Sequence, residues 1–173
     1  MSIYLLQVIN GVGIGMLYFL LAVGLSIVFG LLRFVNFAHG AFYLLGAYFC
    51  YQMMRWGLNF WLALVVVPVV VGIVGWLTEK LLLRHVYAKP HEFHILVTVG
   101  LALVVQKLVI LQWGPLGDTV PVPDLLQGVV MWGRFVYPKY RLFVIGFTAV
   151  LAVGLWYVLE GTRLGSAVRA GSE

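Results

Sequence analysis

The sequence has 173 residues, of which 63% are hydrophobic and only 10% are charged. A soluble domain carries roughly 25% charged residues, so this chain lacks the side chains that would coat a soluble surface. The formal net charge of +5 comes from scattered basic residues, which argues against the concentrated basic face of a nucleic-acid-binding protein. We therefore expect an integral membrane protein that binds the lipid bilayer and no nucleic acid.

Five apolar windows are long enough, or nearly so, to cross a bilayer as helices. A hydrocarbon core of about 30 Å requires roughly 20 apolar residues in a helix. The windows are residues 8–32, 37–54, 60–78, 93–112 and 142–159. The sequence thus predicts an all-α integral membrane protein with about five transmembrane helices. Residues 37–54 begin with polar side chains, so a segment that only re-enters the membrane is the alternative there.

The basic residues between these windows predict the orientation. With five crossings, six basic residues (Arg33, Lys80, Arg84, Lys89, Arg163 and Arg169) lie on one face of the membrane and four (Arg55, Arg134, Lys139 and Arg141) on the other. Basic residues are enriched in cytoplasmic loops. The sequence therefore predicts a cytoplasmic C-terminus and an N-terminus outside. A re-entrant segment at 37–54 would change this parity.

Residues 113–140 form the one substantial polar excursion. The stretch "WGPLGDTVPVPD" is rich in glycine and proline, which favour turns and end helices. The stretch "VVMWGRFVYP" then places β-branched and aromatic residues on both sides of Gly133–Arg134, which is typical of a hairpin. We expect a short extracytoplasmic loop or hairpin between the fourth and fifth helices, with a simple connecting loop as the alternative.

Four side chains between the third and fourth windows suggest a possible metal site: His85, His91, Glu92 and His94. Imidazole and carboxylate groups are common metal ligands, and such a site would suit a membrane-embedded enzyme. The spacing fits no metalloprotease motif, and Pro90 breaks any helix through the segment. We therefore favour histidines at the membrane interface and expect no metal.

Asn36 and His39 interrupt the apolar sequence after the first window. Their spacing of three residues places them on one face of a helix. Polar groups inside a membrane are costly and usually face a protein interior or a water-filled path. The alternative is an ordinary helix start at headgroup level, with Asn36 as the N-cap.

The stretch "GVGIGMLYFLLAVGLSIVFGLLRFVNFAHGAFYLLGAY" resembles the first part of the permeases of branched-chain amino acid ABC importers, the LivH type. Its most specific portion is "NFAHG", followed by an aromatic residue and then "LGAY". Glu79 and Arg84 with "HVYAKP" resemble the first cytoplasmic loop of that family, and "HILVTVGLALVVQKLVILQWGP" resembles its next helix. "GTRLGSAVRA" resembles the start of the cytoplasmic loop that meets the ATPase, although Ser166 stands where family members commonly have arginine.

The resemblance implies a non-enzymatic permease subunit that imports branched-chain amino acids, with urea or short amides as alternative substrates. Its implied partners are a second permease subunit, two cytoplasmic ATPases and a periplasmic substrate-binding protein, in a bacterial inner membrane. The partner ATPases use the ATP, so no cofactor is expected on this chain. The resemblance also implies that residues 1–173 are the N-terminal portion of one permease transmembrane domain, either a fragment or a split gene product. A membrane subunit that supports assembly without transporting is the alternative from another class.

The same resemblance assigns the candidate site residues. It places Asn36 and His39 beside the translocation path. It also implies an ATPase-coupling loop that begins at about residue 160 and is incomplete here. The residues implied for this loop are Thr162, Arg163, Leu164, Gly165 and Arg169.

Overall fold

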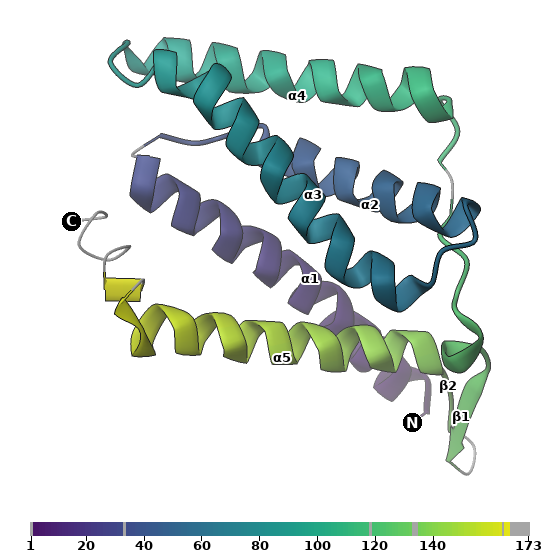
Figure 1. Cartoon of the computed structure of the whole chain (residues 1–173). Coiled ribbons are helices and arrows are strands. Elements are labelled where there is room, and N and C mark those ends of the chain that lie inside the picture. Colours follow the sequence, from purple (N-terminus) through teal and green to yellow (C-terminus); the bar gives the residue numbers. More distant parts are fainter. Residues whose placement is uncertain (1, 33, 118, 133–134, 164, 167–173) are drawn as a thin grey trace. The chain divides into compact units, whose positions relative to one another are not determined.

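The computed structural model describes residues 2–32, 34–117, 119–132, 135–163 and 165–166. The elements, in chain order, are α1 (Ser2–Leu32), α2 (His39–Arg55), α3 (Phe60–Leu81), the 3-10 helix η1 (Leu83–His85), α4 (His91–Trp113), the 3-10 helix η2 (Asp124–Leu126), β1 (Val129–Trp132), β2 (Phe135–Pro138) and α5 (Lys139–Gly161) (Figure 1). They belong to two compact units. Unit 1 comprises Met1–Arg33 with Val122–Glu173, and unit 2 comprises Phe34–Pro121.

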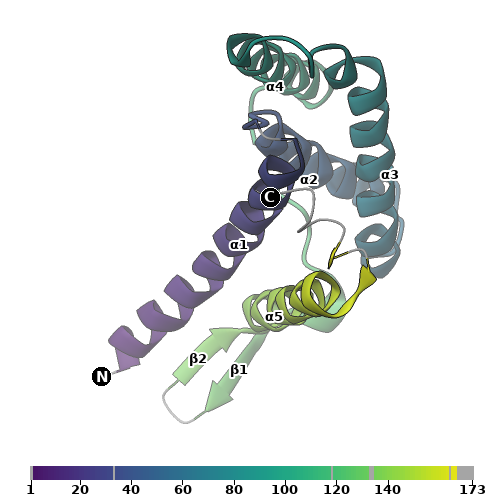
Figure 2. The ribbon, with the colours of Figure 1, turned by 90° about the vertical axis from the view of Figure 1, so that its left-hand side faces the viewer.

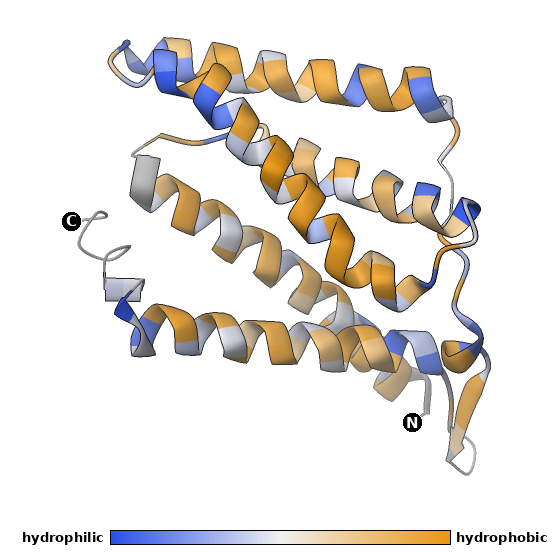
Figure 3. Cartoon of the chain, in the orientation of Figure 1, coloured by the Kyte–Doolittle hydropathy of each residue, from blue (hydrophilic) through white to orange (hydrophobic). Residues whose placement is uncertain are grey.

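Four helical segments are long and apolar enough to cross a membrane. They are Tyr4–Gly30, Phe60–His85, His91–Trp113 and Lys139–Gly161. Figure 3 shows that apolar ribbon dominates these helices, with polar segments gathered mainly toward their ends. The chain is therefore a mostly helical, multi-pass membrane protein. These four segments correspond to four of the five predicted windows.

The fifth window, residues 37–54, corresponds to α2, which is a helix of only 17 residues. At 1.5 Å per residue it is about 25 Å long, somewhat less than the roughly 30 Å of a hydrocarbon core. The count of five spans therefore stays a prediction. No break interrupts α2 between His39 and Arg55.

Unit 2 is built from α2, α3 and α4, and local signals fix where these helices begin and end. The side-chain oxygen of Asn59 accepts a hydrogen bond from the backbone N–H of Trp61 at 2.9 Å, which caps the start of α3. Pro90 directly precedes α4, and Gly114 ends it with φ of +93°, a conformation that glycine adopts without strain. At the C-terminal ends of α2 and α4, the indole N–H of Trp113 donates to Gln52 Oε1 at 2.8 Å.

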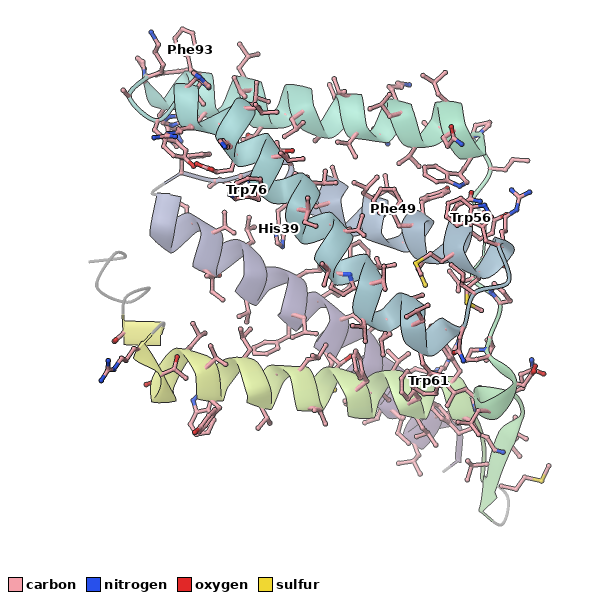
Figure 4. All side chains as sticks on the ribbon, viewed as in Figure 1. His39, Phe49, Trp56, Trp61, Trp76 and Phe93 are labelled. Carbon is pink, nitrogen blue, oxygen red and sulfur yellow. The ribbon has the colours of Figure 1, made fainter. Side chains whose placement is uncertain are left out.

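Aromatic side chains mark both ends of unit 2. Trp56 and Trp61 flank the connection from α2 to α3, whereas Trp76 and Phe93 lie toward the opposite end of the unit (Figure 4). The ammonium group of Lys80 lies 5.0 Å from the ring centroid of Trp76, within the range of a cation–π interaction. Tryptophan and other amphipathic aromatics collect at the two membrane–water interfaces. The two ends of α3 therefore have the character expected at those interfaces.

Unit 1 contains α1, α5, η2 and an antiparallel pair of strands. In β1 and β2 the register pairs Val129 with Pro138 and Met131 with Val136, and Figure 2 shows the two strands side by side next to α5. The strands lie where the sequence predicts a hairpin. The residues between them, 133–134, are outside the described residues, and the side of the membrane on which this segment lies stays a prediction.

One polar cluster ties the three parts of unit 1 together. Asn10 Oδ1 of α1 accepts hydrogen bonds from the hydroxyl of Tyr137 at 2.9 Å and from Nη1 of Arg141 at 2.6 Å. Tyr137 is the next-to-last residue of β2 and is only 1% exposed, and Arg141 belongs to the first turn of α5. A single amide oxygen therefore links α1, the hairpin and α5.

Glycine also allows α1 and α5 to approach. A Cβ atom at Gly13 would lie 3.2 Å from Cγ1 of Ile145, whereas a Cβ at Gly11 would meet nothing within 4 Å. Alanine favours a helix over glycine by up to about 1 kcal/mol. We expect Gly11→Ala to be neutral or stabilising, and Gly13→Ala to be about 1 kcal/mol less stable than Gly11→Ala because the added methyl crowds Ile145. Unfolding in detergent by SDS titration measures both, and equal stabilities would contradict the contact.

Candidate functional site

Asn36 organises the connection between α1 and α2. Its side chain is buried, and its Oδ1 accepts a hydrogen bond from the backbone N–H of Ala38 at 3.0 Å. The backbone carbonyl of Asn36 accepts from the N–H of His39 at 3.1 Å. These two bonds form a tight turn of the kind that asparagine favours. The turn delivers the chain into α2.

The expectation that Asn36 and His39 share a helix face is wrong. The helix α2 begins at His39, and Ala38 occupies the N-cap position without a side-chain hydrogen bond. Asn36 therefore lies two residues before the cap, because its amide group bonds the local backbone instead of projecting from a helix. The alternative expectation of Asn36 as the N-cap is close to this arrangement but two residues out of register.

His39 is the first residue of α2, and its side chain is half-buried. Figure 4 shows its ring near the start of α2. Among the described residues, its ring has no hydrogen-bond partner. The imidazole of His39 is thus partly exposed at the start of a helix and makes no hydrogen bond to the described residues. The side chain of Asn36, in contrast, is hydrogen-bonded within the turn. The role of either residue in a translocation path stays a prediction.

Phe34 packs the same connection onto the start of α4. Its side chain is 1% exposed, its ring is stacked on the imidazole of His94 with centroids 4.3 Å apart, and the ring of Tyr87 lies 6.0 Å away. We call Phe34, Val86, Tyr87 and His94 the Phe34 joint. The joint holds the segment before α2 against the segment between η1 and α4. Both segments therefore lie at one end of unit 2.

His94 is buried within this joint. Its Nε2 lies 2.6 Å from the carbonyl oxygen of Val86, and because a carbonyl only accepts hydrogen bonds, Nε2 must carry the hydrogen. Its Nδ1 is buried and has no hydrogen-bond partner among the described residues. One turn further along α4, the hydroxyl of Thr98 donates to the backbone carbonyl of His94 at 2.8 Å. His94 is thus a packed structural histidine.

Tyr87 connects the Phe34 joint to α3. Its hydroxyl donates to Glu79 Oε1 at 3.0 Å. Burial, followed by the hydrogen bond to Glu79 and the negative charge of that carboxylate, raises the pKa of Tyr87 to about 12, although Arg84 acts in the opposite direction. The hydroxyl therefore stays protonated and keeps donating at any physiological pH. This bond links the C-terminal end of α3 to the segment that precedes α4.

The geometry does not support the metal site considered for His85, His91, Glu92 and His94. Within the part of the chain that the structure describes, which includes all four, no three such side chains converge on a point that would suit a metal ion. The rings of His91 and His94 are edge to face with centroids 6.1 Å apart. The ring of His94 instead stacks on Phe34, and its Nε2 is hydrogen-bonded to the carbonyl oxygen of Val86. These four side chains therefore do not form the metal site that a metal-dependent enzyme would need.

A new helical turn follows α5 at the expected position of the coupling loop. Thr162 has extended backbone angles and interrupts the helix, and its hydroxyl donates to the carbonyl of Val158 at 2.6 Å. The same oxygen accepts from the N–H of Gly165 at 3.3 Å, and the carbonyl of Thr162 accepts from the N–H of Ser166 at 3.1 Å. This is the arrangement of a threonine N-cap. Arg163 lies in that turn, whereas Leu164 and Arg169 are outside the described residues.

Sequence reasoning missed the Phe34 joint. Phe34 follows an arginine at the end of a long apolar window, and nothing in its spacing distinguishes it from Phe37, which is 49% exposed. His94 carried a signal, since a histidine just after a helix start is costly to bury unless it is hydrogen-bonded. Its partner is a backbone carbonyl eight residues earlier, and only the folded connection brings the two groups together.

The family described as "Branched-chain amino acid transport system / permease component" matches residues 7–173. The chain belongs to this family. The family is one of transport permeases, which are not enzymes. The sequence resemblance to branched-chain amino acid ABC permeases is confirmed.

Individual relatives agree with this assignment. The chain is 28% identical over 186 aligned positions to the high-affinity branched-chain amino acid transport system permease protein LivH of Escherichia coli K12, and the match covers 98% of the chain and 59% of that protein. Protein BraD of Pseudomonas aeruginosa is 27% identical with the same coverage. A probable LivH permease of Methanocaldococcus jannaschii is 29% identical, over 89% of the chain and 50% of that protein.

The chain thus spans between half and three-fifths of the length of these curated relatives. No solved structure matches this chain.

Proposed function

We propose that the chain forms part of the membrane passage of an ATP-driven importer for branched-chain amino acids, in a bacterial inner membrane. The observation that carries the proposal is the match to the permease family over residues 7–173. The relatives LivH and BraD are named as permeases for branched-chain amino acids. In this proposal the chain binds no cofactor, and ATP is consumed by partner subunits. Residues 1–173 contribute one part of a permease transmembrane domain.

The proposal includes five spans, and the contacts within unit 2 support a crossing by α2. Phe34, just before α2, is stacked on His94 at the start of α4, whereas Gln52, near the end of α2, is bonded to Trp113 at the end of α4. The apolar segment His91–Trp113 is long enough to cross a bilayer. Because α2 runs beside α4 from end to end, it reaches nearly the same depth. The positive-inside rule then places the Phe34 joint in the cytoplasm.

Cysteine labelling tests this topology. In a Cys50→Ala background, Phe37→Cys and Lys89→Cys are expected to react with an impermeant thiol reagent only from the cytoplasmic side, and Trp56→Cys only from outside. All three positions are exposed, so access depends on the side of the membrane. Reaction of Phe37→Cys and Trp56→Cys from the same side would show that α2 re-enters without crossing.

The partners in this proposal are a second permease subunit, two cytoplasmic ATPases and a periplasmic binding protein. The turn that starts at Thr162 supports a coupling segment, because Thr162 both ends α5 and caps the next helical turn. A change of tilt in that turn would be passed directly to α5. Arg163 adds a cation in that turn, which on the proposed topology faces the cytoplasm, and Leu164, Gly165 and Arg169 complete the proposed segment.

Uptake of labelled leucine by membrane vesicles that contain the chain with its partner subunits tests the proposed function. His39→Leu is expected to reduce ATP-dependent uptake at least several-fold while leaving membrane insertion intact, because removing a polar group from a membrane helix favours insertion. Asn36→Leu should also reduce uptake. Asn36→Asp is the matched control, since it keeps the acceptor for the N–H of Ala38.

Two results would count against the function as proposed. Uptake of urea or short amides instead of leucine would change the substrate class. Unchanged leucine uptake by His39→Leu and Asn36→Leu would remove both residues from the path and leave them as parts of a helix start.

A further inference from the structure

Lys107 is a charged residue within a membrane-crossing helix. It belongs to α4 and lies six residues before the last residue, Trp113. At 1.5 Å per residue, its Cα is about 9 Å from that end of the helix. Figure 3 shows a polar segment that interrupts the mostly apolar second half of α4. An ionisable side chain at such a depth is costly and usually faces a protein interior or a water-filled cavity.

Lys107 projects from the side of α4 that the unit leaves open. The buried residues of α4 are His94, Thr98, Val105 and Val109, which fall on one side of a helix. Lys107 is two positions from both Val105 and Val109, and so lies about 200° around the helix from each of them. Its side chain is exposed, as are those of Leu103 and Leu111 one turn away on either side.

The described residues of unit 2 offer Lys107 no carboxylate. Their acidic side chains are Glu79 and Glu92. Glu79 belongs to the end of α3 and is bonded to Tyr87. Glu92 precedes Lys107 by fifteen residues of α4, a rise of about 22 Å. The positive charge is therefore uncompensated at its own depth within the described part of unit 2.

The direction of α4 also makes it difficult for the Lys107 side chain to reach the nearer membrane surface, at the Trp113 end of the helix. Long charged side chains often reach along a helix to the headgroups. Side chains on an α-helix, however, tilt toward its N-terminus. For Lys107 that direction leads away from Trp113 and toward the middle of α4. Gln106, which is also exposed, adds a second polar group at this level.

We propose that Lys107 lines the water-filled passage and that its ammonium group contacts the carboxylate of the transported amino acid. This inference rests on the proposed function. A lysine ammonium is a flexible point charge with three donors. It attracts a carboxylate without the fixed two-bond geometry of an arginine pair, which suits a ligand that must also leave. Gln106 supplies an amide beside it for a second polar contact.

Thiol accessibility tests the location of Lys107 independently of transport. In the Cys50→Ala chain, in native membranes with its partner subunits, Lys107→Cys is compared with Val65→Cys. Val65 is 66% exposed and five residues from the start of α3, so it is a matched apolar position. The thiolate is the reactive species and forms only where water reaches. Lys107→Cys is expected to react with a charged methanethiosulfonate at least tenfold faster, and equal slow reaction would overturn the proposal.

Substrate discrimination tests the carboxylate contact. With vesicles as above, Lys107→Gln is expected to lower leucine uptake at least tenfold, and Lys107→Arg to retain more uptake than Lys107→Gln. Unlabelled leucinamide, which lacks the carboxylate, should compete poorly with leucine in the parent chain. Unchanged leucine uptake by Lys107→Gln would overturn the contact. If the parent chain itself imports no leucine, the proposed function fails, whereas the labelling result still decides where Lys107 lies.

Discussion

Phe34→Ala is expected to lower the free energy of unfolding by about 3–5 kcal/mol, the range for removing a fully buried phenylalanine side chain. The side chain is 1% exposed and stacked on His94 at 4.3 Å. Its loss would leave a cavity between the start of α4 and the connection that leads into α2. SDS-titration unfolding of the purified chain in detergent, followed by circular dichroism, measures the change.

Phe37→Ala is the matched control. Phe37 is the same residue type, three positions along the same connection, but it is 49% exposed. Surface substitutions usually change stability by no more than about 0.5 kcal/mol. The two variants should therefore differ by about 2.5 kcal/mol or more. Equal losses would mean that the Phe34 joint contributes no specific packing.

Asn10→Leu is expected to destabilise unit 1 by about 2–3 kcal/mol. The substitution removes the oxygen that accepts from Tyr137 and Arg141. A hydrogen bond to a charged group contributes about 1.5–3 kcal/mol and a neutral one about 1 kcal/mol, and leucine in a membrane helix offsets part of the loss. The same unfolding titration measures the effect.

Gln7→Leu and Asn10→Asp serve as the two controls for that cluster. Gln7 is exposed and three residues before Asn10 on α1, so Gln7→Leu should leave stability nearly unchanged. Asn10→Asp keeps an acceptor for both donors and adds a charge opposite to that of Arg141, so it should retain most of the stability. Destabilisation by Gln7→Leu equal to that by Asn10→Leu would contradict the role of the cluster.

Each cluster includes residues of a segment that leads into a helix. The Phe34 joint secures the entry into α2 by packing it on His94 and Val86. The Asn10 cluster secures the hairpin and the start of α5 on α1. Many large apolar side chains on the described helices are exposed, as a bilayer allows, because lipid is as apolar as a protein core and gives helices little reason to bury them. Polar and aromatic contacts between connecting segments and helices therefore supply part of the stability that a buried apolar core supplies in a soluble protein.

The sequence alone determined the class of protein and the approximate helices. Four of the predicted windows coincide with helices long enough to cross a bilayer, and their bounds follow from apolar stretches that end at groups such as Pro90 and Gly114. The resemblance carried by "NFAHG" and its surroundings predicted the family that residues 7–173 match. These features are local or compositional, since an apolar run of sufficient length forms a helix in a membrane whatever its neighbours are.

Only the tertiary structure decided which polar side chains are hydrogen-bonded and packed, and which remain partly exposed without such a contact. Asn36 and His39 form a plausible pair by spacing, yet Asn36 bonds the backbone of Ala38 while His39 begins the helix. His94 looked like one of several interfacial histidines, and it packs between Phe34 and Val86. Each of these outcomes depends on where the chain turns between helices. Hydropathy carries no information about those turns, because it averages over the very residues whose hydrogen bonds set them.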